Sequence, residues 1–478
     1  MKSLNILLVL LCVNSWAQDY SSAIEKARFL IQHHQKQTNI PGVQVAAMVD
    51  GELIWSESFG FKDLDKKIEV SKQTKFRIAS VSKSLTSVAF GKMLETGLIN
   101  LDDDIHKLVP EFPQKKYMLT PRHLASSTSG IRHYVSKQEA SSTVNYKSLI
   151  HALDRFKNDT LLFEPGSNYE YSSYGWVLLG AAMERVSQKN FQEIMQDTWD
   201  TIGMKNTSFD LPDHTDTTKT KFYIKDKHQR AIAPSENRSF MYPGGGYLST
   251  AEDLVLMGNA LLANTYLSEQ TRNTLFEKIT LTNGTKINYG LGWEVGESRL
   301  KTSIVYHSGS MGTSRSHLIL YPQENVVFAY IANTGDEVFF NDREAQSIAE
   351  LFIEVKRNIE NKSKVINTDN LIGSWEIETT SLRDKKSKGT LQLHKNENGI
   401  IEGYVEFTRS RGKKEFPIIL SSKIENKVHL IAVNPMFIDF YIELSENTFT
   451  GQWLHDFNVN GTPEKDSYWC PRAIHGKK

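Results

Sequence analysis

The alternation of apolar and polar residues near the start of the chain predicts a helix followed by an antiparallel hairpin. Residues 20–37 fit a helix that ends before Ile40-Pro41-Gly42. Residues 43–49 and 52–56 then form two strand-like runs separated by Asp50-Gly51. An Asp-Gly pair between two such runs is a strong hairpin signal, because both residues tolerate the positive φ angles of a two-residue turn.

A second stretch with helical spacing begins after Ser80. Apolar residues recur at Val81, Leu85, Val88 and Leu94, which predicts an amphipathic helix. Further along, the pattern predicts a buried helix at 176–183, paired strands at 318–322 and 326–332, and a helix at 345–357 that packs on the sheet. With a helical insertion between about 101 and 240, this arrangement predicts an α+β fold: one antiparallel sheet flanked by helices, plus a helical subdomain.

The character of the chain changes after residue 357. Residues 358–370 are polar and charged and predict a linker between a domain at 20–357 and a domain at 371–478. Short alternating runs then follow at 389–394, 400–407, 428–433, 437–444 and 448–453. Such spacing predicts a small all-β barrel or sandwich, and the opening Gly373-Ser374-Trp375 resembles the start of lipocalin-like barrels. A packing module is the favoured role, with ligand binding as the alternative.

The N-terminus predicts export. Lys2 precedes a short apolar run and Ala17 ends a small-residue cleavage site, so we expect residues 1–17 to be a signal peptide of a periplasmic or secreted protein. No later stretch is apolar enough to span a membrane. Lipidation at Cys12 is the alternative, which the bulky Leu11 disfavours. Cys470 would then be the only cysteine, so we expect no internal disulfide.

Composition and charge narrow the possible partners. The 478 residues are 39% apolar and 23% charged, a balance that allows a large buried core. Since 56 basic residues balance 56 acidic ones, nothing suggests nucleic acid or an anionic membrane as a partner. A small-molecule or short-peptide substrate fits better, and the sequence leaves the oligomeric state open.

Ser80 and Lys83 are the first candidates for chemistry. Three residues apart at the start of a helix, they should share one helix face. A partly buried lysine with a lowered pKa can remove the proton from a serine hydroxyl and make it a nucleophile. The same tetrad occurs at Ser298–Lys301 and Ser410–Lys413, but the first leads into a strand-like run and the second is a glycine-broken turn.

Tyr171 is the candidate for a second proton-transferring group. Pro165-Gly166 fixes a turn, and Tyr171 then precedes the predicted buried helix, so a rigid loop can point its phenol inward. Filling the core is the alternative, because the Tyr-x-Ser pattern recurs at Tyr247-Leu248-Ser249.

The run His307-Ser308-Gly309-Ser310 follows the strand-like residues 303–306. A glycine here lets a substrate lie against the backbone, and the amides of Ser80 and Ser310 can form an oxyanion hole. His307 can change its charge near neutral pH, although a lone histidine is often structural.

Together, Ser80-x-x-Lys83, Tyr171-x-Ser173 and His307-Ser308-Gly309 resemble the three motifs of the serine β-lactamase and penicillin-binding-protein superfamily. Residues 120–131, 163–166 and 243–253 resemble its peptidase and esterase branch near class C β-lactamases, and most closely the mitochondrial serine β-lactamase-like proteins. The resemblance covers about residues 25–355.

The resemblance implies roles for these residues. Ser80 would be the acylated nucleophile, Lys83 its base, and Tyr171 the proton relay that also activates the deacylating water. Ser173 stands where β-lactamases usually carry asparagine, and His307 where they usually carry lysine. Both departures weaken the case for penicillin as the substrate, and both occur in the peptidase and esterase relatives.

The remaining candidate motifs give weaker evidence for a catalytic or binding site. Asp102-Asp103-Asp104 fits a helix cap better than a metal site, and Gly244-Gly245-Gly246 fits a loop beside the site rather than a phosphate loop. His123 and His133 flank a loop near the site and are interpreted as structural. No metal and no cofactor are implied.

We therefore expect an exported serine hydrolase that acts on peptide or amide bonds. Ester hydrolysis and then β-lactam hydrolysis are the alternatives. Two alternatives assign a binding function instead of catalysis. In one, the chain is a non-catalytic protein that binds cell-wall peptides. In the other, the barrel domain is the functional part and binds an apolar ligand.

Overall fold

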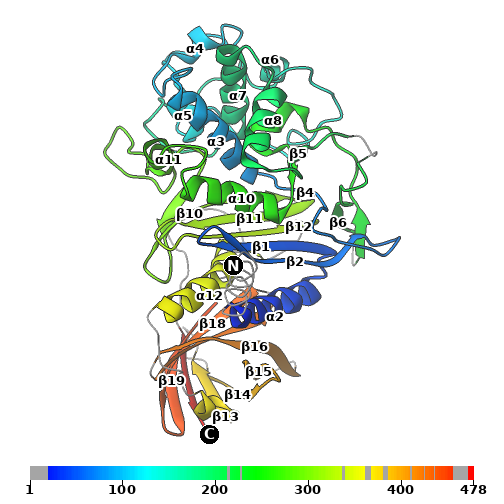
Figure 1. Cartoon of the computed structure of the whole chain (residues 1–478), viewed down its shortest axis with the longest axis vertical. Helices are drawn as coiled ribbons and strands as arrows, with labels where there is room; N and C mark the ends of the chain where they lie inside the picture. Colours follow the sequence, from blue (N-terminus) through cyan, green and yellow to red (C-terminus); the bar gives the residue numbers. More distant parts are fainter. Residues whose placement is uncertain are drawn as a thin grey trace, which may run out of the picture. The chain divides into compact units, whose positions relative to one another are not determined.

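The computed structural model confirms an α+β fold followed by a closed β-barrel (Figure 1). It describes residues 20–212, 216–226, 229–335, 340–360, 368–380, 386–409, 412–424, 426–434, 436–455 and 472–478. The predicted signal peptide, most of the predicted linker, Ser410 and Cys470 lie outside the described residues. Contacts divide the chain into two compact units, Ile40–Val338 and Met1–Asn39 with Phe339–Lys478, and each is described by itself.

A seven-stranded antiparallel sheet forms the base of the unit at Ile40–Val338. Its strands lie in the order β3 (Ile68–Glu69), β2 (Glu52–Asp63), β1 (Gly42–Val49), β12 (Val326–Ala332), β11 (Ser314–Tyr321), β10 (Ser303–Met311) and β9 (Glu294–Glu297). The predicted hairpins are confirmed: Val49 pairs with Glu52 across Asp50 and Gly51, whose φ angles are 50° and 86°, and Tyr321 pairs with Val326.

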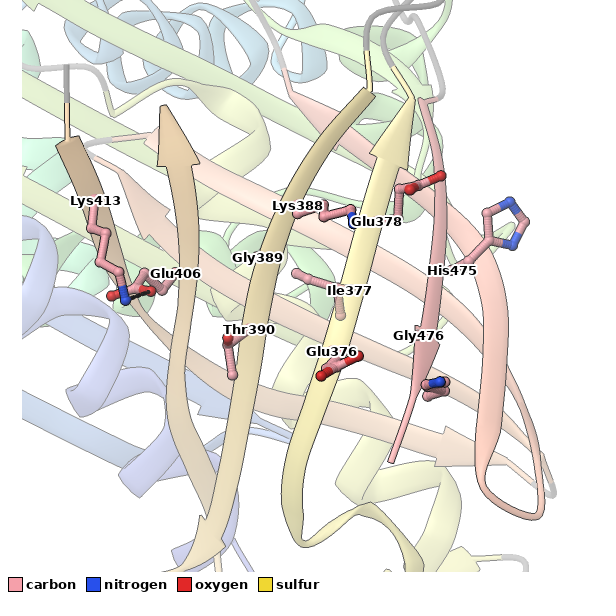
Figure 2. Close-up of a pocket in the computed structure, with 11 residues that line it drawn as sticks. Glu376, Ile377, Glu378, Lys388, Gly389, Thr390, Glu406, Lys413, His475 and Gly476 are labelled. Carbon is pink, nitrogen blue, oxygen red and sulfur yellow. Dashed lines mark ion pairs between the residues drawn. The ribbon is translucent and has the colours of Figure 1, made fainter. Parts of the chain in front are cut away.

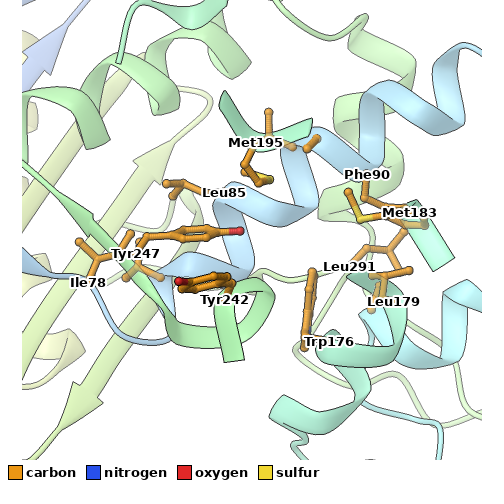
Figure 3. Close-up of a cluster of buried hydrophobic side chains, with 14 of the residues drawn as sticks. Ile78, Leu85, Phe90, Trp176, Leu179, Met183, Met195, Tyr242, Tyr247 and Leu291 are labelled. Carbon is orange, nitrogen blue, oxygen red and sulfur yellow. The ribbon is translucent and has the colours of Figure 1, made fainter. Parts of the chain in front are cut away.

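Helices and short helical turns surround this sheet, and Figure 1 shows α10 lying along one face of it. They are α3 (Val81–Glu95), α4 (Ile105–Leu108), α5 (Pro121–Ala125), α6 (Leu149–Ala152), η1 (Leu153–Arg155), α7 (Ser173–Ser187), α8 (Phe191–Ile202), η2 (Ser239–Met241), α9 (Tyr242–Gly245), α10 (Ala251–Leu262) and α11 (Glu269–Phe276). Their apolar faces meet in one core, in which Leu85 and Phe90 of α3 and Trp176 and Met183 of α7 take part (Figure 3). The packing around α3 fixes the helix that carries Ser80 and Lys83.

Three details of this unit differ from the predictions. The insertion at 101–240 is not wholly helical, since it contains β5 (Ser208–Phe209), β6 (Tyr223–Asp226) and β7 (Gln229–Ile232). β5 joins β8 (Tyr247–Ser249) and β4 (Phe76–Arg77) in a small sheet. Strand β10 does not stop before His307 but continues to Met311, because each residue from Val305 to Met311 pairs with β11.

The other unit contains α2 (Ser21–Thr38), α12 (Asp342–Glu360) and η3 (Asp369–Leu371) beside the barrel. α2 contacts α12 and the barrel strands, and Lys26 Nζ donates a hydrogen bond to the Ser421 carbonyl oxygen at 2.7 Å. Both helices fit the predicted ranges. The packing of the second helix on the large sheet stays a prediction.

Eight antiparallel strands close the barrel. They are β13 (Gly373–Thr380), β14 (Lys386–Lys395), β15 (Ile401–Arg409), β16 (Gly412–Ile424), β17 (Lys427–Asn434), β18 (Met436–Ser445), β19 (Thr448–His455) and β20 (Arg472–Lys477). The longest, β16, was not predicted because Lys413, Lys414 and Pro417 interrupt its apolar pattern.

Large apolar side chains fill the barrel interior, among them Phe407, Phe440 and Trp453, whose rings stack. Charged residues line a depression of about 570 Å³ on the exposed side of β13, β14 and β20, where Glu406 pairs with Lys413 at its edge (Figure 2). The role of the barrel as a packing module stays a prediction.

Candidate active site

Ser80 is held at the N-terminus of α3 by a tightly packed turn. It occupies the N-cap position, and the preceding Ala79 has a φ of 46°, a strained value for a residue with a side chain. The Ser316 hydroxyl of β11 donates to the Ile78 carbonyl oxygen at 2.6 Å and fixes this turn on the sheet. Both α3 and the large sheet therefore position the Ser80 hydroxyl.

Lys83 lies one helical turn beyond Ser80 and is fully buried, with 0% of its surface exposed. Its Nζ is 3.2 Å from Ser80 Oγ, 2.9 Å from Ser173 Oγ and 2.6 Å from the Gly244 carbonyl oxygen. All three partners are neutral oxygen atoms. A buried ammonium with only neutral partners is costly, and burial lowers the pKa of Lys83 well below its usual value. The amine can therefore accept a proton from Ser80.

Tyr171 is the last residue but one before α7, and it faces the same pair. Its ring centroid is 4.8 Å from Lys83 Nζ. Burial raises the pKa of its phenol, and a hydrogen bond with the Ser80 side chain offsets this rise only in part. The phenol is therefore protonated at neutral pH, which suits a proton relay better than a permanent phenolate base.

His307 lies on β10 beside the rings of Tyr171 and Tyr289. Its ring centroid is 6.2 Å from that of Tyr171, its Nε2 is 3.1 Å from the Tyr289 hydroxyl, and its Nδ1 is 2.7 Å from the Ser308 carbonyl oxygen. A carbonyl oxygen only accepts, so Nδ1 carries a proton in this arrangement. Both ring nitrogens of His307 are thus hydrogen-bonded to protein atoms, whereas a lysine at this position would extend a free cation toward a substrate.

The remaining motif residues follow His307 along β10. Ser308 and Gly309 pair with His317 and Ser316 of β11, and the exposed Ser310 pairs with Arg315. Gly309 lies against the backbone just before Ser80. The oxyanion hole formed by the amides of Ser80 and Ser310 stays a prediction.

The structure shows three contacts that the sequence did not predict, two of them in segments expected near the site. The Gly244 carbonyl oxygen, on a helical turn rather than the expected loop, bonds to Lys83, and Tyr289 bonds to His307. His133, interpreted above as structural, accepts the Ser173 amide at Nδ1 over 3.1 Å. These contacts join residues 18 to 161 positions apart, so no local pattern indicates them.

The rival motifs that lie within the described residues form turns and helix caps. Asp104 caps α4 by accepting the His106 amide, as predicted, and Asp102 pairs with Arg122. Ser298 and Lys301 form the turn between β9 and β10. Across the described ranges, no cluster of three His, Cys, Asp or Glu side chains is placed to hold a metal ion. Among those same residues, no helix is long and apolar enough to cross a membrane.

The chain is similar in sequence to proteins with a serine β-lactamase-like domain. The family model described as Beta-lactamase matches residues 27–352. The mitochondrial serine beta-lactamase-like protein LACTB of Mus musculus is 27% identical over 408 residues, which cover 64% of this chain and 74% of that protein.

Solved structures share the fold. The octameric penicillin-binding protein homologue from Pyrococcus abyssi matches with a TM-score of 0.59 and 17% identity, over 94% of this chain and 99% of that one. A D-stereospecific amidohydrolase from Streptomyces sp. gives 0.56 and 18%, over 66% and 98%. EstCE1, a hydrolase with promiscuous acyltransferase activity, gives 0.57 and 19%, over 70% and 98%. With the family model spanning more than half of its length, the chain belongs to the Beta-lactamase family of serine hydrolases.

Proposed function

We propose that the protein is an exported serine hydrolase that cleaves peptide or amide bonds through an acyl-enzyme on Ser80. The observation that carries this proposal is the buried amine of Lys83, 3.2 Å from Ser80 Oγ and surrounded by neutral oxygen atoms. Export is proposed from residues 1–17 of the sequence.

In the acylation step, Lys83 Nζ takes the Ser80 proton while Ser80 Oγ attacks the substrate carbonyl carbon. The oxyanion formed lies toward the amides of Ser80 and Ser310. When the carbon–nitrogen bond breaks, the Tyr171 phenol donates its proton to the leaving nitrogen and regains one from Lys83. In deacylation the oxygen of a water molecule attacks the acyl carbon while one of its protons passes through Tyr171 and Lys83 to Ser80 Oγ. The bond between the acyl carbon and Oγ then breaks, which releases the carboxylic acid and restores the serine hydroxyl.

Amides rank before esters because of Tyr171. An amine must be protonated as it leaves, whereas the alcohol of an activated ester departs more easily without a proton donor. A protonated phenol beside Ser80 supplies that proton. The neighbours described as an amidohydrolase and as EstCE1 are compatible with both substrate classes.

β-Lactams rank last. The strand motif offers His307, whose ring nitrogens bond to Tyr289 and Ser308, in place of a lysine that would attract the β-lactam carboxylate. A non-catalytic peptide-binding role is disfavoured, because Ser80, Lys83 and Tyr171 are all in place.

Turnover of a substrate panel tests the proposal. Purified wild-type protein and Ser80→Ala would be compared on D- and L-aminoacyl anilides, p-nitrophenyl esters and a chromogenic cephalosporin. We expect turnover of at least one anilide by the wild type and none by Ser80→Ala. Turnover of esters alone would favour the esterase alternative, and equal turnover by Ser80→Ala would contradict the proposal.

A further inference from the structure

The segment that carries Tyr171 is fastened to the loop that follows α5. The Glu170 amide donates to the Ser127 carbonyl oxygen at 3.0 Å, and the Ser172 hydroxyl donates to the Arg132 carbonyl oxygen at 2.9 Å. The next bond along the chain joins the Ser173 amide to His133 Nδ1 at 3.1 Å. Residues on both sides of Tyr171 are thus bonded to one loop.

His133 makes two contacts with the segment that carries Tyr171. The first amides of a helix have no partner within it, and the Ser172 hydroxyl satisfies that of Gly175. The Ser173 amide, at the first position of α7, is satisfied by His133 instead. The His133 ring also lies edge-on to the Tyr171 ring, with 5.5 Å between centroids. One side chain therefore holds both the backbone after Tyr171 and its ring.

The hydrogen bond requires an unprotonated Nδ1. Burial, and next the charge of Lys83, lower the pKa of His133 to about 4, while Glu139 opposes this shift. At neutral pH the imidazole is therefore uncharged, and Nδ1 can accept the Ser173 amide.

We propose that His133 is a positioning residue for acylation of Ser80 and acts through Tyr171. This inference rests on the proposed function. Without the acceptor at position 133, the Ser173 amide at the start of α7 is unpaired. Without the His133 ring, the Tyr171 ring loses a packing contact. A shift of about 1 Å in a reacting group can cost about a hundredfold in rate, so the geometry of this segment bears directly on proton relay.

Three substitutions separate the two contacts. Asn Oδ1 can take the place of His Nδ1, so His133→Asn keeps the acceptor. His133→Phe keeps a ring against Tyr171 but has no acceptor, and His133→Ala removes both. On the best amide substrate of the panel, we expect His133→Asn to keep kcat within about threefold of the wild type. We expect His133→Phe and His133→Ala to lose about tenfold to a hundredfold in kcat, with KM changed less than threefold.

The matched control is His151→Ala, a change at an exposed histidine of α6, which should leave kcat unchanged. Circular dichroism and the unfolding temperature would establish that each variant is folded. If His133→Phe and His133→Ala do not fold, His133→Asn alone decides: a tenfold loss in folded His133→Asn contradicts the proposal.

A double-mutant cycle tests the route through Tyr171. In a Tyr171→Phe background the relay is already absent, so His133→Phe should cost less than about threefold further. The same tenfold loss in both backgrounds, or wild-type kcat in folded His133→Phe, would overturn the inference. Wild-type protein that is not acylated on Ser80 would instead overturn the proposed function, so the two failures are distinguishable.

Discussion

Gly309 of β10 lies against Ile78, two residues before the proposed nucleophile Ser80. A Cβ added at Gly309 would be 2.2 Å from the Ile78 carbonyl oxygen and 2.2 Å from Ser316 Oγ, far inside normal contact distance. The glycine of the strand motif therefore allows the sheet to pack on the turn before Ser80. Gly309 thus allows close backbone packing, in addition to the substrate contact expected from the sequence.

Gly309→Ala should disturb this turn. Neither obstructing group can move freely, since the Ile78 oxygen accepts the Ser316 hydroxyl. We expect the free energy of unfolding to fall by about 1–3 kcal/mol, the usual range for an overpacked core site, together with a loss of acylation. Gly296→Ala in β9 is the matched control, because a Cβ there finds its nearest atom at 3.7 Å. Urea unfolding of both variants measures the difference, and equal stability would show that the turn adapts.

Lys83 should set the acidic limb of the pH–rate profile. A protonated amine cannot accept the Ser80 proton, so acylation falls as the pH drops through the lowered pKa of Lys83 and rises above it. Lys83→Arg keeps a positive charge at all pH values. We expect it to lower the acylation rate by about 10²–10⁴-fold, the range for loss of a general base.

Lys92→Arg, on the part of α3 where Lys92 pairs with Glu95, is the control for this exchange. Stopped-flow acylation of both variants between pH 5 and pH 10 provides the measurement. An unaltered rate in Lys83→Arg would remove the lysine from the mechanism.

Tyr171→Phe should affect amides more than activated esters. The variant keeps the ring beside Lys83 but removes the proton that an amine leaving group needs. We expect amide turnover to fall by about 10²-fold or more, and turnover of a p-nitrophenyl ester to fall less. Steady-state kinetics on a matched anilide and ester, with Tyr117→Phe as the control, tests this. Equal losses on both substrates would assign Tyr171 to a step that they share.

Glu344 should make the stability of the barrel unit depend on pH. It lies at the start of α12 and accepts the Phe437 amide of β18, and burial raises its pKa to about 7. Between about pH 4.5 and 7 the folded state holds a proton that the unfolded state has released. The contribution of this group is therefore complete below about pH 4.5 and is lost as the pH rises through 7.

Chemical denaturation at pH 5 and pH 8 checks the sign. The wild type should lose more stability between these values than Glu344→Gln, while the exposed Glu397→Gln should behave as the wild type does. A steeper loss in Glu344→Gln would contradict the assignment.

The sequence predicted those parts of the fold that depend on short-range patterns. The Asp50-Gly51 turn and the helix after Ser80 were found because their signals lie within a few residues. Strand β16 was missed because Pro417 and its neighbouring lysines obscure it, although its pairing with β15 and β17 overrides that local pattern.

The site likewise combines residues that local motifs predict with contacts that depend on distant segments. The three motifs identify Ser80, Lys83, Tyr171 and His307 as candidates. The sequence also places His133 and the Gly244 run near the site, but it does not predict the hydrogen bonds that they form there. His133 acquires its partner only when α7 packs against the loop that follows α5, 40 residues earlier in the chain. A backbone carbonyl has no sequence signature at all. Such contacts depend on packing between distant segments.

Intact-mass spectrometry during reaction with a slowly hydrolysed substrate tests the central claim most directly. The protein would be quenched within one turnover, weighed, and digested to map the adduct. The account predicts one added acyl group, located on Ser80, which accumulates in the wild type and is absent from Ser80→Ala. An adduct on another residue, or turnover without any covalent adduct on Ser80, would contradict it.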